Sequence, residues 1–532
     1  MERPIPYHPL LAAIAPVLLL LSANAQYVSP GTALRPIAIL MAVTACAWLL
    51  TGLLFRSLPK SATVTTVAVA AVTLTGPVIS MLPRRALIER PVEILPQQLG
   101  GTLLIVLWVI LLYLSLRTSK AERTTAPLNA ILACLVAVPL LNIGYHSLTT
   151  PRPVAAKART VENIAPVHHP DIFYILPDAY ARADILQDLY GFDNGAFLTG
   201  LTNMGFRVCE ESRSNYCQTG LSAASTFNMD YLDEPDEATG VGASGYRDEV
   251  LQLLRDSGLL AKLRGAGYEI ISYNSGYRGT ALPAADRFVT LTGSGSEFER
   301  VFWSLVALPF RGLPFLQYIP SLDPYIDHAT RITGTLDSLP NQREGDSPVF
   351  VFAHVICPHP PFVFGANGER VRPEYSFRYG DADMIIPEHI SREDYVKGYV
   401  AQVRFLNQRL LQTVRSIQDA SSDPCIIVVQ SDHGARSQLV WENPSADSMK
   451  EAFAILNAYY VPDEVEAKLY EGITPVNTFR LILNYCLGID LPLLEDRSYF
   501  SKWSTPYDFI DVTELARGRQ DPAAARRLTE AE

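Results

Sequence analysis

The stretch that decides the fold is Cys425-Ile-Ile-Val-Val-Gln430, followed directly by Ser431-Asp432-His433-Gly434. Its first part is a short apolar run, which is typical of a strand buried on both faces of a parallel sheet. Polar side chains follow where the strand ends. Because ligands bind beyond the carboxyl ends of the strands in such sheets, we interpret Ser431–Gly434 as part of a functional site.

Four similar apolar runs predict further strands, at Asp171–Leu176, Tyr268–Tyr273, Val349–Ala353 and Ala454–Val461. Between them, Val250–Leu263 and Arg392–Ile417 alternate apolar and polar residues with helical spacing. Strands that alternate with helices predict an α/β fold, with a mainly parallel sheet flanked by helices.

Asp178 follows the first of these strands, so the sheet would bring it to the same edge as Asp432 and His433. Two carboxylates and an imidazole make a suitable site for one divalent cation. Manganese, zinc, calcium and magnesium all fit such ligands. The structural alternative is that each residue only caps a helix or shapes a turn.

Thr219 lies where a turn leads into a predicted helix within Ser214–Asn228. At a helix N-terminus the free amide groups and the helix dipole favour an anion. A cation that stabilises the Thr219 alkoxide would make this hydroxyl a nucleophile. Ser222, one turn further on, is a candidate substrate-binding residue. The alternative is that Thr219 or Ser222 merely caps the helix.

His359 lies between prolines in the loop after the strand at Val349–Ala353. A ring held in a stiff loop can hydrogen-bond to the transferred anion or protonate the leaving oxygen, so we predict a catalytic and substrate-binding role. His354 fits a hydrogen-bonded core histidine, and His389 has no convincing partner spacing. We therefore expect one metal ion.

The mean hydropathy of +0.12 over 532 residues is high for a soluble enzyme. It comes from five apolar stretches, uncharged apart from Arg35, that predict an all-α transmembrane anchor, at Pro9–Ala25, Ala33–Phe55, Ser61–Leu82, Gln98–Leu116 and Ala126–Tyr145. The predicted organisation is an anchor at 1–148, a linker at 149–169, a catalytic domain at 170–515 and a polar, disordered tail at 516–532.

The first apolar stretch also fits a signal peptide that ends at Ala23-Asn24-Ala25. Five spans, or four after cleavage, both place the distal domain outside the cell. Lys and Arg are too evenly distributed among the loops to set the orientation. We therefore expect a multi-pass protein of the plasma (inner) membrane with an extracytoplasmic catalytic domain.

The net charge is divided unevenly along the chain. Residues 1–147 hold 10 Lys and Arg against 4 Asp and Glu, which leaves 34 against 51 in the remainder. A strongly acidic distal part disfavours nucleic acid as a partner. The expected partners are the lipid bilayer and a small or lipid-linked phosphate or sulfate ester.

Together, the four pieces resemble the sulfatase branch of the alkaline phosphatase superfamily. The order is Asp178, Gln218-Thr219, His359 and Ser431-Asp432-His433-Gly434, and the resemblance runs from about Pro170 to at least Pro462. It is strongest to the membrane-anchored lipoteichoic acid synthases and phosphoethanolamine transferases. It implies that Asp178, Thr219, Asp432 and His433 hold one divalent cation, with Thr219 as covalent nucleophile and His359 on the substrate.

One departure from the sulfatases favours phosphoryl transfer. The chain has no Cys-x-Pro-x-Arg motif for maturation to formylglycine, because Cys217 is followed by Gln218-Thr219-Gly220-Leu221. The leading hypothesis is a metal-dependent hydrolase or transferase of phosphate or sulfate esters. The alternatives are a catalytically silent domain that binds an anionic glycan or lipid headgroup, and a transport protein, which the uncharged spans disfavour.

Cys209 and Cys217 flank a short polar loop just before Thr219. In an oxidising compartment they could form a disulfide that stiffens this loop. Two unpaired thiols are the equal alternative.

Overall fold

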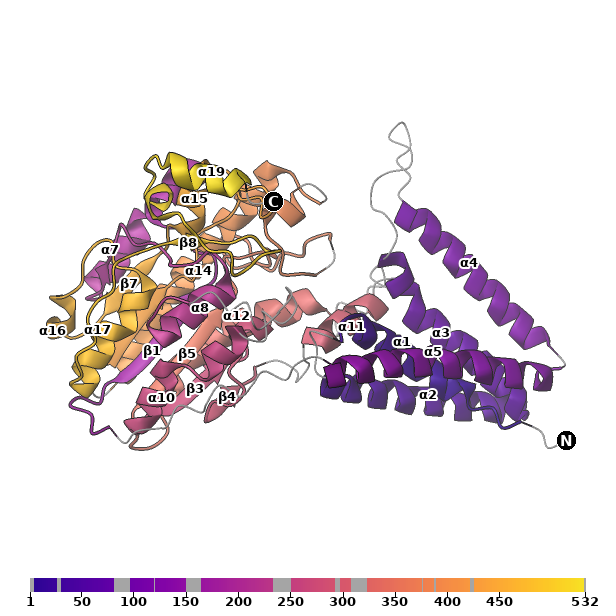
Figure 1. Ribbon diagram of the computed structural model, residues 1–532. Coiled ribbons are helices and arrows are strands. Elements are labelled where there is room, and N and C mark those ends of the chain that lie inside the picture. The colour runs from indigo at the N-terminus through magenta and orange to yellow at the C-terminus, as the bar shows by residue number, and fades with distance from the viewer. Residues whose placement is uncertain are drawn as a thin grey trace. The chain divides into compact units, whose positions relative to one another are not determined.

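The computed structural model divides into two compact units (Figure 1). One comprises Met1–Pro151 with Ser294–Pro324, and the other comprises Arg152–Gly293 with Tyr325–Glu532. The structure describes residues 4–25, 30–80, 96–118, 120–149, 164–232, 250–291, 297–307, 323–375, 377–386, 389–421 and 425–530. Most of the predicted linker lies outside these residues.

The N-terminal unit is a set of apolar helices: α1 His8–Ala23, α2 Leu34–Phe55, α3 Leu58–Ser80, α4 Pro96–Arg117 and α5 Glu122–Thr149, with the short η1 at Pro30–Ala33. Within the described residues, the four helices α2 to α5 are long and apolar enough to cross a membrane. The predicted all-α unit of about five apolar helices is confirmed, whereas the number of spans stays a prediction: α1 has only 16 residues, a length of about 24 Å against a hydrocarbon core of about 30 Å.

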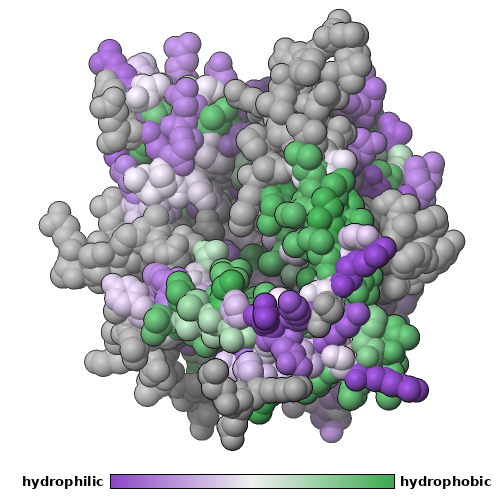
Figure 2. All heavy atoms as spheres, turned by 90° about the vertical axis from the view of Figure 1, so that its right-hand side faces the viewer, coloured by the Kyte–Doolittle hydropathy of each residue, from purple (hydrophilic) through white to green (hydrophobic). Residues whose placement is uncertain are grey.

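Hydrophobic side chains cover much of this helical unit. Leu49, Leu50, Leu53 and Leu54 at the end of α2 are all exposed. Figure 2, which looks onto the end of this unit, shows hydrophobic side chains in green on its surface. A surface of this kind suits a lipid environment.

Helix α1 is packed into the unit along α5. Its backbone amide at His8 donates to Asn129 Oδ1 over 2.9 Å, and Asn142 Nδ2 donates to Ser22 Oγ over 2.8 Å. Helix α11, Glu297–Ala307, also belongs to this unit, although the sequence division placed it in the catalytic domain. The reason is that Phe298 and Phe302 bury their rings among the apolar helices.

The second unit is built on a seven-stranded sheet in the order β2-β7-β6-β1-β5-β3-β4. The strands are β1 Asp171–Pro177, β2 Arg207–Val208, β3 Glu269–Tyr273, β4 Arg287–Val289, β5 Val349–Val355, β6 Cys425–Gln430 and β7 Asn457–Tyr460. Strands β1, β3, β4, β5 and β6 pair in parallel, while β7 and β2 pair antiparallel. The α/β fold with a mainly parallel sheet is confirmed.

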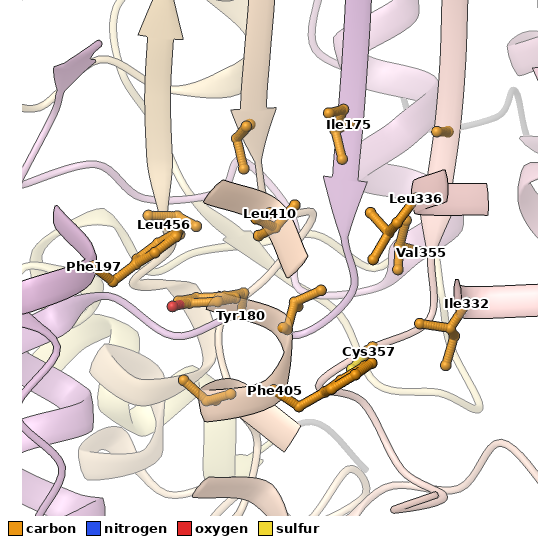
Figure 3. Close-up of a cluster of buried hydrophobic side chains, with 14 of the residues drawn as sticks. Ile175, Tyr180, Phe197, Ile332, Leu336, Val355, Cys357, Phe405, Leu410 and Leu456 are labelled. Carbon is orange, nitrogen blue, oxygen red and sulfur yellow. The ribbon is translucent and has the colours of Figure 1, made fainter. Parts of the chain in front are cut away.

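The sheet is buried on both faces, which explains its continuous apolar strands. On β1, Phe173 and Ile175 belong to one core cluster (Figure 3), whereas Ile172 and Tyr174 belong to another on the opposite face. The first face is covered by α6 Ala183–Tyr190, α7 Gly195–Asn203, α12 Pro324–Ser338 and α14 Arg392–Ala420. The second is covered by α8 Thr219–Asn228, α10 Gly258–Gly265 and α17 Pro475–Leu487.

Smaller elements complete this unit: η3 Arg278–Thr280, η7 Leu339–Asn341, α13 Ala382–Ile385, α15 Ala446–Phe453, α16 Asp463–Glu466, β8 Tyr499–Phe500, β9 Ile510–Asp511, α18 Thr513–Ala516 and α19 Pro522–Glu530. The single helix predicted at Val250–Leu263 is wrong, because helix 250–255 ends before α10 begins. Ser257 is the N-cap of α10, and its Oγ accepts a hydrogen bond from Leu260 N.

The prediction of a disordered tail is also wrong, because residues 522–530 form α19. Ala524 and Leu528, four residues apart on one helix face, are buried in a cluster with Trp441, Phe453 and Ile510. The two apolar side chains thus anchor an otherwise charged segment to the second unit.

Leu528→Ala should lower the free energy of unfolding by about 2–3 kcal/mol, because it empties a packed position. Arg527→Ala is the matched control, since Arg527 is the exposed neighbour on the same helix. Urea unfolding of the purified chain measures both variants. Equal stability of the two variants would show that the tail does not pack on the domain.

Candidate metal centre and active site

The carboxyl ends of three adjacent strands bring the predicted ligands together. Strand β1 lies between β5 and β6, with Leu176 beside His354 and Ile175 beside Val429. Side chains alternate between the two faces of a strand. Asp178, His354 and Asp432 continue the alternation of the residues that face α8, and α8 begins at Thr219.

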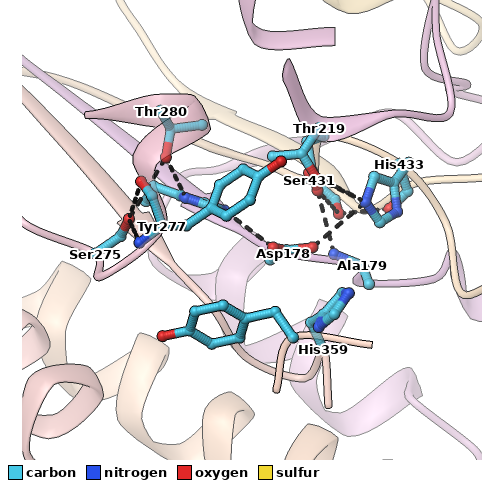
Figure 4. Close-up of polar contacts among 12 residues, drawn as sticks. Asp178, Ala179, Thr219, Ser275, Tyr277, Thr280, His359, Ser431 and His433 are labelled. Carbon is cyan, nitrogen blue, oxygen red and sulfur yellow. Dashed lines mark hydrogen bonds and ion pairs between the residues drawn. The ribbon is translucent and has the colours of Figure 1, made fainter. Parts of the chain in front are cut away.

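The side chains of Thr219, Asp178 and Asp432 all lie close to the His433 ring, and Figure 4 shows Thr219, Asp178 and His433 near one another. His433 Nε2 lies 3.1 Å from Thr219 Oγ1, 3.2 Å from Asp432 Oδ2 and 3.4 Å from Asp178 Oδ1. All four residues are buried. A tetrahedral cation with bonds of about 2.0–2.1 Å separates its ligand atoms by about 3.3 Å, which matches the three distances from His433 Nε2.

In each of the two carboxylates, one oxygen has a hydrogen-bond partner and the other does not. Asp432 Oδ1 accepts from Ala179 N at 3.2 Å, and Asp178 Oδ2 contacts His354 Nε2 at 3.1 Å. Among the described residues, Asp178 Oδ1 and Asp432 Oδ2 have no hydrogen-bond partner although both are buried. Buried oxygens of this kind are costly unless something compensates them, so the residues fit a divalent cation.

The ring of His433 is oriented for the same role. Its Nδ1 donates to Gly434 O over 2.9 Å, which leaves the lone pair of Nε2 toward the carboxylates. Burial and the nearby Arg436 guanidinium lower the pKa of His433 and favour the neutral imidazole that binds metals. A Cβ at Gly434 would lie 2.1 Å from Glu451 O, so this turn accepts only glycine.

Backbone strain lies next to the candidate ligands. Ala179 has φ +62°, a left-handed conformation that is uncommon for alanine. This conformation accompanies the donation from Ala179 N to Asp432 Oδ1. Tyr180 N donates in turn to Ser431 Oγ over 2.8 Å, so the turn after β1 is joined to the turn after β6.

His359 is placed beside the four ligands and faces a second set of charges. Its ring centroid lies 6.5 Å from that of His433. Its Nδ1 donates to Pro360 O over 2.6 Å, and its Nε2 lies 3.3 Å from Asp381 Oδ1. Burial opposes protonation, but the Asp178 and Asp381 carboxylates outweigh it and raise the pKa of His359 to about 9. These two carboxylates therefore favour the protonated imidazole.

A buried arginine that the sequence analysis missed completes this charge cluster. Arg436 donates through Nη2 to Asp381 Oδ1 over 2.7 Å and through Nη1 to Cys217 O over 2.6 Å. Trp441 Nε1 donates to the other Asp381 oxygen over 2.9 Å. Arg436 thereby links the turn before Thr219 to the partners of His359.

The structure agrees with some of the predicted site residues and differs at others. The helix start at Thr219 is confirmed, and Ser222 is buried one turn along α8. His354, expected in the core, contacts Asp178 and groups with Asp178 and Asp432 as potential metal-binding side chains. His389 stacks on Tyr375.

The sequence carried uneven clues to the missed residues. Arg436 lies only two residues after Gly434, so its position beside the motif could have indicated it. Asp381 lies 22 residues after His359 and 51 residues before Asp432, outside both histidine motifs, and gave no such clue. The disulfide alternative is wrong: Cys209 and Cys217 are unpaired and buried, and burial raises the pKa of Cys209 to about 12.

No protein-family model matches the sequence, and no curated protein matches it either. Solved structures give distant matches. The C-terminal periplasmic domain of EcEptC from Escherichia coli is 10% identical, with a TM-score of 0.41, and the match covers 66% of this chain and 95% of that one.

The integral membrane protein lipooligosaccharide phosphoethanolamine transferase A (EptA) from Neisseria meningitidis is 13% identical, with a TM-score of 0.41. This match covers 87% of the present chain and 76% of the transferase. The BT33494S-sulf protein of Bacteroides thetaiotaomicron is 13% identical over 60% of this chain and 72% of its own, with a TM-score of 0.35.

Proposed function

We propose that the chain is a membrane-anchored, metal-dependent enzyme that transfers or hydrolyses phosphate esters through a covalent threonine intermediate. The observation that carries this proposal is the convergence of Thr219 Oγ1 and His433 Nε2 with the two unpartnered oxygens of Asp178 and Asp432. A nucleophile, a cation site and a helix N-terminus at one point suit displacement at phosphorus.

The charges of the site support an anionic substrate. Asp178, Asp381 and Asp432 carry three negative charges, and His359 and Arg436 supply two positive ones. The site is therefore negative by one charge on its own and positive by one charge with a divalent cation. An anionic ester would be repelled in the first state and attracted in the second.

Asp178, Asp432, His433 and Thr219 would hold the cation, and the donor set does not distinguish manganese, zinc, calcium or magnesium. When bound, a divalent cation supplies stabilisation of the Thr219 alkoxide and of the charge on the phosphoryl oxygens. His433 contributes a neutral ring fixed by Gly434 O. Thr219 is the first residue of α8, so the free amide groups of the first turn lie at the same end of the helix as this hydroxyl and favour an anion there.

Thr219 reacts as the alkoxide, its hydroxyl proton having been released to solvent. In the first step, its Oγ1 forms a bond to phosphorus while the bond from phosphorus to the leaving oxygen breaks. His359, whose protonated form the neighbouring Asp381 favours, gives its proton to that oxygen. In the second step, water or an alcohol attacks the phosphothreonine and returns a proton to His359, which frees Thr219. Water makes the enzyme a hydrolase, and an alcohol makes it a transferase.

The apolar helices of the N-terminal unit indicate where the enzyme would meet its substrate. Helices α2 to α5 are of spanning length, so the proposed enzyme acts at a membrane surface, where a lipid-linked ester is available. The predicted side is extracytoplasmic. The absence of a formylglycine motif before Gly220-Leu221 favours phosphate over sulfate.

Thr219→Ala should lower turnover of bis(p-nitrophenyl) phosphate by about 10³-fold or more, because it removes the nucleophile. Thr219→Ser should keep part of the activity. Acid-quenched wild-type protein should carry a phosphoryl adduct on the peptide that contains Thr219, which mass spectrometry measures directly.

Thr226→Ala is the matched control for this experiment. Thr226 is also buried on α8, but its hydroxyl donates to Ser222 O rather than contacting His433. Activity of Thr219→Ala equal to that of Thr226→Ala would refute the nucleophile. Wild-type protein that binds the ester without any turnover would favour the catalytically silent domain.

Adding Zn²⁺ or Mn²⁺ to chelator-treated protein should stabilise the wild type by about 2.7 kcal/mol at a concentration one hundred times Kd. Asp432→Asn should lose most of this increment, because it removes a charged ligand. Asp171→Asn is the control: Asp171 is buried, but Val349 N and Arg343 occupy its oxygens. An unchanged increment in Asp432→Asn, measured by thermal unfolding, would contradict the site.

A further inference from the structure

Asp178 is held by a line of side chains that lies outside the four candidate ligands. His354 Nε2 lies 3.1 Å from Asp178 Oδ2, and Thr280 Oγ1 lies 2.7 Å from His354 Nδ1. His354 comes from β5 and Thr280 from η3, and all three residues are buried. Figure 4 shows these contacts running from Thr280 to Asp178.

The chemistry of the groups sets the direction of the hydrogen bonds. An ionised carboxylate only accepts, so His354 Nε2 carries the proton and donates it to Asp178 Oδ2. The other nitrogen of a neutral imidazole is an acceptor, and the Thr280 hydroxyl is the donor within reach. Thr280 thereby selects the tautomer that His354 needs in order to hold Asp178.

The two candidate metal-binding carboxylates, Asp178 and Asp432, have the same arrangement of contacts. Ala179 N occupies Asp432 Oδ1, and His354 occupies Asp178 Oδ2. In each case the second oxygen is the one without a hydrogen-bond partner among the described residues, and it lies within 3.4 Å of His433 Nε2. A carboxylate free to rotate would offer either oxygen and would lose this alignment.

We propose that His354 and Thr280 are positioning residues that fix Asp178 so that its Oδ1 faces the cation. The inference rests on the metal site of the proposed function. Although His354 lies close enough to Asp178 and Asp432 to join them as a ligand, both of its ring nitrogens already have partners. The inference therefore assigns it a role other than ligand of this or of a second cation. Residues that orient metal ligands in this way typically contribute about 10- to 100-fold to metal affinity.

The test is calorimetric titration of the chelator-treated full-length protein with Zn²⁺ alone, which gives stoichiometry and Kd without any substrate. His354→Leu should keep one site per chain and raise Kd by about 10- to 100-fold. His354→Gln should recover much of the affinity, since its amide can still donate to Asp178. Thr280→Val should weaken binding less, and Thr280→Ser should restore it.

Thr413→Val is the matched control. The Thr413 hydroxyl is also buried, but it donates to Leu336 O and contacts no residue of the site. The Thr280 pair keeps the inference testable if His354→Leu does not fold. An unchanged Kd for Zn²⁺ in both His354→Leu and Thr280→Val would overturn the positioning role of His354 and Thr280 while leaving the metal site intact. Two sites in the wild type and one in His354→Leu would overturn it in favour of a second-metal ligand. A wild type that binds no Zn²⁺ would overturn the metal site as well.

Discussion

Two buried carboxylates of like charge, Asp178 and Asp432, meet at the edge of the sheet, and this constraint governs the rest of the site. Within the described part of the chain, one oxygen of each has no hydrogen-bond donor. Burial removes the water that would solvate these charges, and their repulsion adds to the cost. A divalent cation beside His433, as we propose, would offset both effects.

The surrounding fold serves this alignment. Strand order places β1 between β5 and β6, so the turns after β1 and β6 lie side by side and exchange hydrogen bonds from Ala179 and Tyr180. Gly434 lets the second turn approach Glu451 O. On the other side of His359, Arg436 holds both Asp381 and the carbonyl of Cys217, so the turn before Thr219 is connected to the cationic part of the site.

Much of the fold follows from local sequence patterns, and the failures have physical causes. The five long strands were predictable because burial on both faces makes each a continuous apolar run, whereas β2 and β4 are too short to show one. The tail helix depends on only two buried side chains, Ala524 and Leu528, among charged neighbours. Of the site, the residues after β1 and β6 were predictable from strand ends. His354 looked like a core residue because sequence does not reveal the partners of a buried ring, which here come from β1 and η3.

Anomalous X-ray diffraction at the zinc edge, from crystals of the protein grown with Zn²⁺, tests the central claim most directly. One strong peak should lie between Asp178 Oδ1, Asp432 Oδ2, His433 Nε2 and Thr219 Oγ1, within about 2.0–2.2 Å of each. Density for zinc only elsewhere on the protein, with these four side chains in their present contacts, would contradict it.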